Sequence, residues 1–131
     1  MRWWFTTLAL LLPMILTGCA SGQEDAVRDR VASFHDAIKG QDWAGACALL
    51  APETRTELEA AAKKPCSEAL PEEQLPEPGA LDRVDVFGTM AEVRFQGETL
   101  FLTRFADDWL LHAAGCTPQP PKPYDCALHG G

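Results

Sequence analysis

The spacing of apolar residues changes at Val84, and this change limits the chain to a fold in which helices precede strands. Upstream of Val84, apolar residues recur at intervals of three and four, as in amphipathic helices; the first stripe is Val27, Val31, Phe34 and Ile38. Downstream, they recur at every second residue, as in strands. Helices followed by a run of strands predict an α+β domain, with the helices packed on one face of a curved antiparallel sheet.

Three helices are expected in the first half of the chain. The first carries the apolar stripe and ends near Gly40. The second begins at Asp42, because its carboxylate can accept a hydrogen bond from a free backbone N–H of the first turn. The third begins at Pro52, a residue that suits the first helical position, and ends before Pro65. Residues 67–79 hold three prolines and four glutamates and are expected to form an extended surface loop, with a short turn at Ser67–Leu70 as an alternative for its start.

Four strands in meander order are expected between residues 84 and 114. The turns between them are expected near Thr89, at Gly97-Glu98 and at Asp107-Asp108. Four prolines follow between residues 118 and 123, and proline cannot donate to a strand ladder. The tail is therefore expected to be irregular.

The N-terminus begins with Met1 and the basic Arg2 and continues with the apolar segment Trp3–Ile15. This segment has 13 residues, whereas a membrane-spanning helix needs about 20. Its length instead fits the apolar core of an export signal, roughly 7–15 residues. Pro13 also disfavours a permanent membrane helix. The segment therefore predicts export.

The apolar segment ends in Leu16-Thr17-Gly18-Cys19, which resembles the lipobox of bacterial lipoprotein signals. The resemblance implies cleavage before Cys19 and acylation of its thiol, and ordinary secretory cleavage close to Cys19 is the alternative. Cleavage before Cys19 would divide the chain into a signal peptide (1–18), a lipidated tether (19–23) and a folded domain (24–131). Several acyl chains anchor a protein more stably than one. The expected location is therefore the cell membrane, facing outside the cytoplasm, with the lipid as the membrane contact.

Once Cys19 is assigned to the lipid, four cysteines remain: Cys47, Cys66, Cys116 and Cys126. An even number of cysteines in an oxidising compartment predicts two disulfides. Three pairings are open, and we expect the local ones, Cys47–Cys66 and Cys116–Cys126. The chain has no Cys-x-x-Cys motif and no histidine at zinc-ligand spacing from a cysteine pair, so neither a metal nor a cofactor is expected.

The folded part is acidic. Removal of residues 1–18 takes away only Arg2 among the charged residues, which leaves 10 basic and 19 acidic residues and a net charge of −9. Phosphate polymers repel such a chain, so nucleic acid is not expected as a partner.

Several short motifs follow one another in a fixed order: Phe34, then Gly40-x-Asp42-Trp43-x2-Ala46-Cys47, then Trp109-Leu110-Leu111, and at the end Ala114-Gly115-Cys116 with Pro123-Tyr124-Asp125-Cys126. Together they resemble small NTF2-like (cystatin-like) α+β domains, in particular the lipid-anchored versions of actinobacteria, over residues 24–130. The resemblance implies a cone built on a four-stranded sheet, whose mouth can hold a small molecule. The candidates to line that pocket are Phe34, Trp43, Phe101 and Trp109, and the alternative is that these aromatic residues are core.

Enzymes of the resembled superfamily place an Asp or His base with Tyr or Asp partners in an apolar cavity. Here the sole tyrosine, Tyr124, lies in the tail, and the capping role of Asp42 explains that carboxylate. His112 is expected to face away from the packed side of its strand, and His35 is expected at the edge of the apolar stripe. No catalytic residues are therefore predicted.

Three functions remain as hypotheses. The main one is a non-catalytic anchored module that binds an envelope protein, a peptide or a small ligand. The alternative is a small-cavity enzyme or a hydrophobic-ligand carrier that uses the interior of the cone. A third is an inhibitor-like or structural protein that uses the acidic loop of residues 68–77.

Overall fold

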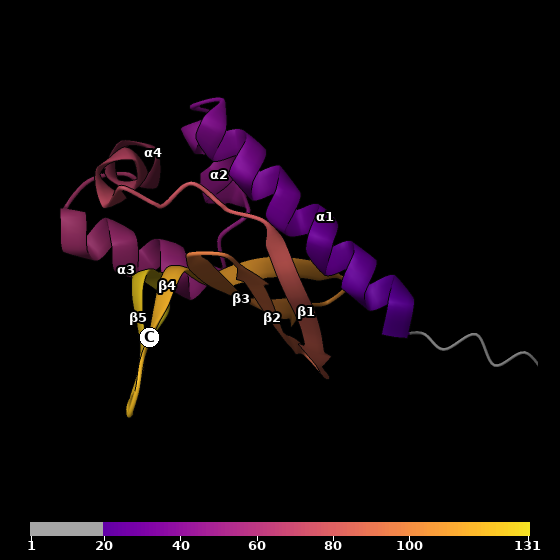
Figure 1. Cartoon of the computed structure of the whole chain (residues 1–131). Coiled ribbons are helices and arrows are strands. Elements are labelled where there is room, and N and C mark those ends of the chain that lie inside the picture. Colours follow the sequence, from indigo (N-terminus) through magenta and orange to yellow (C-terminus); the bar gives the residue numbers. More distant parts are fainter. Residues whose placement is uncertain (1–19) are drawn as a thin grey trace, which may run out of the picture.

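The computed structural model describes residues 20–131, and the expected signal peptide and Cys19 lie outside the described residues. The helical half and the strand half follow each other as predicted, so the α+β class is confirmed (Figure 1). The helical elements are α1 (Ala20–Lys39), α2 (Trp43–Ala48), α3 (Pro52–Ala62), α4 (Cys66–Ala69) and the 3-10 helix η1 (Leu70–Glu73). The strands are β1 (Leu81–Phe87), β2 (Met90–Phe95), β3 (Glu98–Phe105), β4 (Asp108–Gln119) and β5 (Lys122–His129).

The sheet has five strands, in the order β1-β2-β3-β4-β5, and every neighbouring pair is antiparallel. The prediction of four strands and an irregular tail was therefore wrong. The tail forms the end of β4 and all of β5, with Pro120 and Pro121 in the turn between them. Prolines are tolerated there because β5 is an edge strand, and Pro118 lies past Cys116, the last β4 residue that pairs with β3.

Helix α1 lies diagonally across one face of the sheet (Figure 1). It buries the predicted stripe, with Val27, Val31 and Phe34 fully enclosed. It begins at Ala20, so residues 20–23, which were expected to be part of a tether, are helical. Among residues 20–131, no helix is both long enough and apolar enough to cross a bilayer.

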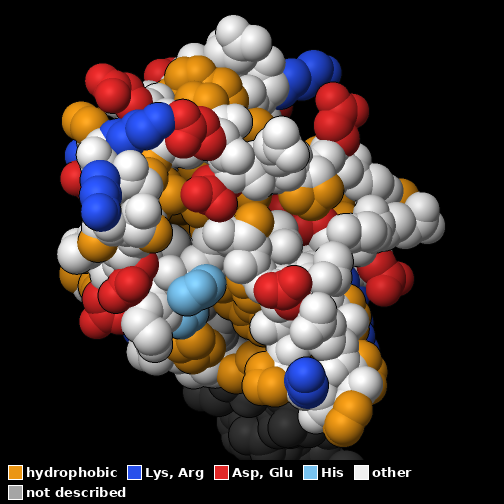
Figure 2. Space-filling view, turned by 90° about the vertical axis from the view of Figure 1, so that its left-hand side faces the viewer, with side chains coloured by type: hydrophobic (Ala, Val, Ile, Leu, Met, Phe, Trp, Pro, Cys, Tyr) orange, Lys and Arg blue, Asp and Glu red, His pale blue; other side chains and the backbone are white. Residues whose placement is uncertain are grey.

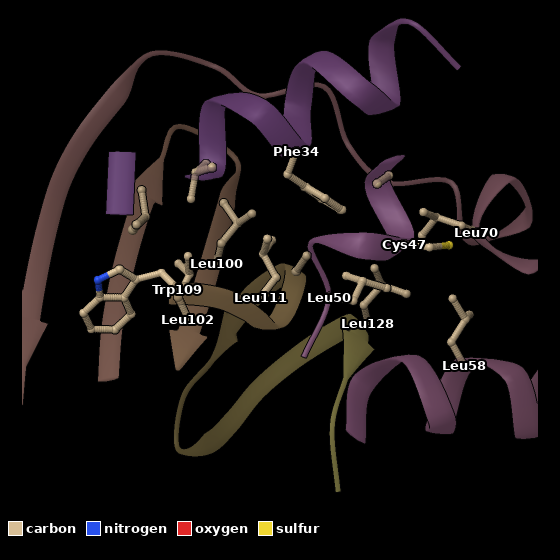
Figure 3. Packing of buried hydrophobic residues seen from close by; sticks show 14 of the residues in the cluster. Phe34, Cys47, Leu50, Leu58, Leu70, Leu100, Leu102, Trp109, Leu111 and Leu128 are labelled. Carbon is tan, nitrogen blue, oxygen red and sulfur yellow. The ribbon is translucent and has the colours of Figure 1, made fainter. Parts of the chain in front are cut away.

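The core fills the space between the helices and the sheet (Figure 3). Phe34 points from α1 toward Leu111 on β4 and Leu50 after α2, and all three are buried. Leu100 and Leu102 of β3 lie beside them and are also buried. Interiors packed in this way leave few voids larger than a water molecule.

Residues 67–79 contain more helix than the short turn at Ser67–Leu70 that was considered in an otherwise extended loop. Cys66–Glu73 is helical, as α4 followed by η1, and only residues 74–80 are without regular structure. The physical reason is burial, because Cys66, Ala69 and Leu70 all face the core and an extended chain would not bury all three. Proline and glutamate at the surface of this segment therefore did not prevent it from folding.

Both disulfides have the expected local pairing. Cys47–Cys66 joins α2 to α4 across a sequence separation of 19, and Cys116–Cys126 joins β4 to β5 across a separation of 10. Cys116 and Cys126 are also directly paired in the strand register. The two bonds fix the helical half and the tail separately.

The two ends of the sheet are different. The β1–β2 turn at Gly88-Thr89 and the β3–β4 turn at Ala106-Asp107 share one end, because consecutive antiparallel strands reverse direction. The start of α1 lies at this end, where Trp109 Nε1 donates to Gln23 Oε1 at 3.1 Å. The β2–β3 turn at Gln96-Gly97 lies at the opposite end.

Candidate functional site

The four aromatic residues predicted to line a pocket do not lie together. Phe34 and Trp109 are buried in the core, and Trp43 packs against the core while partly exposed. Phe101 lies on the other face of the sheet, because Leu100 and Leu102 on either side of it point toward the helices. There its ring meets Tyr124 of β5 edge to face, with the centroids 5.1 Å apart. The four residues therefore do not line one pocket: Trp109 belongs to the core and Phe101 to the outer face, and only Phe34 and Trp43 share the lining of a surface cleft.

A surface cleft of about 510 Å³ lies instead at the C-terminal end of α1. Its walls are the last turns of α1, the start of α2, the loop of residues 75–78 and the start of β3. The apolar part of the lining is Phe34, Ile38, Trp43, Leu75, Pro76 and Pro78, and the polar part is His35, Asp36, Lys39, Gln41, Glu77 and Glu98. A concave surface with an apolar wall and a few converging polar groups is the usual form of a ligand site.

The base of this cleft contains a buried carboxylate. The side chain of Glu98 is only 1% exposed, and its Oε2 lies 3.1 Å from Nε2 of His35. Its other oxygen, Oε1, accepts a hydrogen bond from the backbone N–H of Gly115 at 3.1 Å. A buried charge is costly unless it is paired and hydrogen-bonded, and both oxygens of Glu98 have a partner here. The cleft is thus lined by a fixed acidic group that the fold has satisfied.

Local backbone geometry places these partners. Glu98 begins β3 directly after Gly97, whose φ of 88° is accessible to glycine at low cost. Gly115 has a φ of 63° and lies at an irregularity of the β3–β4 register, which turns its N–H toward Glu98. A Cβ on Gly115 would lie 3.0 Å from Ala127 Cβ and 3.1 Å from Leu75 Cδ2, so a side chain here would push its neighbours aside, and the positive φ would strain it as well.

His35 is held from both sides. On α1 it follows Phe34, and its ring packs edge to face on Phe95 of β2, with centroids 5.0 Å apart. Its side chain is 15% exposed, on the cleft side of α1. A histidine that donates to a carboxylate through Nε2 offers Nδ1 as an acceptor when neutral and as a donor when protonated.

The prediction missed this pair. Glu98 was assigned to a turn, and His35 was regarded as the edge of an apolar stripe. The available signal was the alternation of side chains along β3. Glu98, Leu100 and Leu102 are spaced two residues apart, so they point to the same face of the sheet, the one that the helices cover. A carboxylate on a covered face needs a partner, and the nearby α1 supplies it.

The other predicted candidates have structural roles. Asp42 caps α2 by accepting a hydrogen bond from Gly45 N at 3.0 Å, as predicted. The backbone carbonyl of His112 accepts bonds from Thr54 Oγ1 and Gly130 N. Asp108 forms an ion pair with Arg30 of α1. Within residues 20–131, no group of three or more His, Cys, Asp or Glu side chains is placed to hold a metal ion.

A second polar cluster lies on the face of the sheet away from α1. Arg94 Nε donates to Glu92 Oε1 at 2.7 Å, and Tyr124 Oη lies 3.4 Å from the same oxygen. The hydrogen bond and the charge of Glu92 raise the pKa of the Arg94 guanidinium above its ordinary value. The cluster is partly buried, and Arg94 and Tyr124 also line a second cleft of about 450 Å³ at the β2–β3 turn.

Figure 2 looks onto the side of the molecule where α3, α4 and β5 lie. Acidic side chains are spread over this side and no broad basic patch interrupts them, as the sequence composition suggested. Comparison of the chain with protein-family models, with curated proteins and with solved structures found no match. The cleft is therefore interpreted from its own geometry.

Proposed function

We propose that this chain is a lipid-anchored, extracytoplasmic binding module without catalytic activity, and that it holds its ligand in the cleft at the C-terminal end of α1. The anchor is Cys19 of the lipobox-like Leu16-Thr17-Gly18-Cys19, and the NTF2-like class remains part of the proposal. Two disulfides support export, because such bonds persist in oxidising compartments.

The observation that carries the ligand site is the Glu98–His35 pair under an apolar wall. Glu98 fixes the His35 ring at the cleft, and Trp43 and Leu75 give the cleft apolar surface. This combination fits a ligand with an apolar part and a polar group that hydrogen-bonds to an imidazole nitrogen. A peptide side chain and a small amphiphile both have this chemistry.

The position of the cleft also suits an anchored protein. His35 is 16 residues beyond Cys19, and helix α1 covers all but the first of these steps. At about 1.5 Å per residue, the helix separates the cleft from the anchor by about 24 Å. A ligand outside the membrane could therefore reach the cleft.

The alternative of an enzyme or a carrier that uses the interior has less support. Phe34, Leu100 and Leu111 fill the space between α1 and the sheet, and all three are fully buried. A carrier needs an internal volume that a ligand can occupy, and side chains packed in this way leave few voids larger than a water molecule.

The anchor is tested by metabolic labelling with an alkyne fatty acid. The wild-type chain should incorporate the label and sediment with membranes, whereas Cys19→Ala should do neither. Ser21→Ala is the matched control, because it changes a neighbouring residue without removing the thiol. Equal labelling of wild type and Cys19→Ala would contradict the anchored proposal.

The cleft is tested with a photo-crosslinking amino acid, p-benzoylphenylalanine, introduced into cells at Lys39. Lys39 lines the cleft, and the matched control is the same replacement at Lys122, an exposed lysine on β5. Irradiation should give a discrete adduct at residue 39 and not at residue 122. The adduct mass then distinguishes a protein from a small molecule. No adduct at residue 39, or the same adduct at both residues, would contradict a ligand site in the cleft.

A further inference from the structure

Three large hydrophobic side chains remain exposed at one end of the sheet. Phe87 is 62% exposed, Met90 40% and Phe105 41%. Phe87 and Met90 face each other across the β1–β2 turn, Met90 in turn faces Thr103 on β3, and Phe105 ends β3 two residues later. These three residues form one apolar group, which we call the hairpin tip. Clustered exposed apolar side chains usually mark a contact surface.

The hairpin tip lies at the end of the sheet where α1 begins. Phe105 pairs with Asp108, the residue before Trp109, and the Trp109 ring donates to Gln23 in the first turn of α1. Asp108 also pairs with Arg30 of α1. Figure 1 shows the arrowhead of β1, where the β1–β2 turn begins, and the indigo start of α1 on the same side of the molecule.

We propose that the hairpin tip is a second membrane contact, which inserts into the headgroup layer of the bilayer that holds the lipid on Cys19. The inference rests on the anchored-module proposal. Cys19 directly precedes Ala20, where α1 begins, so no flexible linker separates the lipid from the folded domain. A lipid at Cys19 therefore brings the start of α1, and with it the hairpin tip, to the membrane surface.

The chemistry of the hairpin tip fits an interfacial position. Aromatic side chains and apolar neighbours are favoured at the boundary between headgroups and acyl chains. Asp107, in the β3–β4 turn, opposes deeper insertion because a carboxylate is costly in the hydrocarbon layer. The contact is therefore shallow.

A second contact would also orient the domain. A lipid alone lets the domain turn about one point, whereas the lipid and the hairpin tip together hold one end of the sheet against the membrane. The cleft near His35 and Glu98 lies toward the other end of α1 and beside the β2–β3 turn. The cleft would then face away from the bilayer.

The test uses the mature, acylated full chain in vesicles of phosphatidylcholine and phosphatidylglycerol whose acyl chains carry bromine, a quencher of tryptophan fluorescence. Phe87→Trp places the reporter in the hairpin tip. Ser67→Trp places the control on α4, an exposed position far from the start of α1. Emission from Trp43 and Trp109 is measured in the parent chain and subtracted. Roughly half of the emission from the reporter at residue 87 should be lost, and bromine near the headgroups should quench it best, while the control reporter keeps its emission.

A second variant tests the shared contact in a chain whose fold is checked separately. Adding Phe105→Ser to the Phe87→Trp chain removes part of the hairpin tip from an exposed position, so the fold should be unchanged by circular dichroism. Quenching at residue 87 should then fall toward the control value. Unchanged quenching in this variant would contradict a shared contact.

The outcomes separate the two proposals. Mass analysis of the N-terminal peptide shows whether Cys19 is acylated. An unmodified Cys19 would overturn the anchored module and, with it, this inference. An acylated chain whose reporter at residue 87 is unquenched would overturn the second membrane contact alone, and crosslinking from the same position would then show whether a second copy covers it.

Discussion

Nε2 of His35 lies 3.1 Å from Oε2 of Glu98, although the two residues are 63 positions apart in the sequence. One stands on the helix that leads away from the proposed anchor, and the other begins a central strand of the sheet. The pair links α1 to β3 at the base of the cleft, beside the bulge that carries Gly115. It is both a structural contact and the most distinctive polar group of the candidate site.

Glu98→Leu should destabilise the domain. The leucine leaves the Gly115 N–H and the His35 ring without their acceptor in a buried site, and an unsatisfied buried donor costs about 1–3 kcal/mol. Glu98→Gln keeps a carbonyl oxygen for the Gly115 N–H and should therefore lower the free energy of unfolding by less. The free energy of unfolding, from urea titration, measures the difference.

The matched control for this substitution is Glu77→Gln, which changes another carboxylate that lines the same cleft but is exposed. It should leave the urea midpoint unchanged. A Glu98→Leu chain as stable as this control would show that the buried hydrogen bonds contribute nothing measurable.

The sequence was sufficient for the features that depend on neighbours along the chain. The helical stripe of Val27, Val31 and Phe34, the Asp42 cap and the alternation of β2 each follow from local spacing, and all were found where predicted. The disulfide pairing was only a choice among three. The structure supports the local choice because Cys116 and Cys126 are paired in register.

The predictions that were wrong concern features that depend on residues far apart in the sequence. β5 forms because Cys126 and Leu128 pair with β4, and that pairing outweighs the reluctance of Pro123 to lie in a strand. The Glu98–His35 contact requires α1 to cross the sheet at one particular place. Phe101 was grouped with Phe34, and only the strand register shows that they lie on opposite faces.

Phe34→Ala and Phe101→Ala test this separation of the two faces. Phe34 is fully buried in the core, and its removal leaves a cavity that should lower the free energy of unfolding by about 3–5 kcal/mol. Phe101 is partly exposed and contacts Tyr124, so its removal should lose about 1 kcal/mol, the typical worth of an aromatic pair. Equal losses in chemical denaturation would contradict the assignment of Phe101 to the outer face.

Removing either disulfide should destabilise the domain by an amount that depends on the length of the loop that the disulfide closes. Replacing both Cys47 and Cys66 by alanine opens the longer loop and should lose about 2–4 kcal/mol, because the unfolded chain gains freedom. The same change at Cys116 and Cys126 opens the shorter loop and should lose about 0.5 kcal/mol less.

Double replacements are the suitable variants, since a single one would leave a free thiol that can exchange with the other bond. Peptide mapping under non-reducing conditions checks that the remaining bond keeps its partners. A larger loss for the tail disulfide than for the helical one would show that loop length does not decide how much each bond stabilises the domain.

Asp42 directly precedes the cleft residue Trp43, and substitutions at Asp42 test whether its carboxylate caps α2 or binds a ligand. Its carboxylate accepts from Gly45 N at 3.0 Å at the start of α2, the helix that carries Cys47 into its disulfide. Asp42→Ala removes this acceptor and should lose about 1 kcal/mol of stability, whereas Asp42→Asn keeps an acceptor of nearly equal capping strength and should be almost neutral. If the carboxylate instead served ligand binding, Asp42→Asn would keep the stability of the wild type but lose the adduct formed from residue 39. Because capping needs an oxygen and not a charge, we expect both the stability and the adduct to survive in Asp42→Asn.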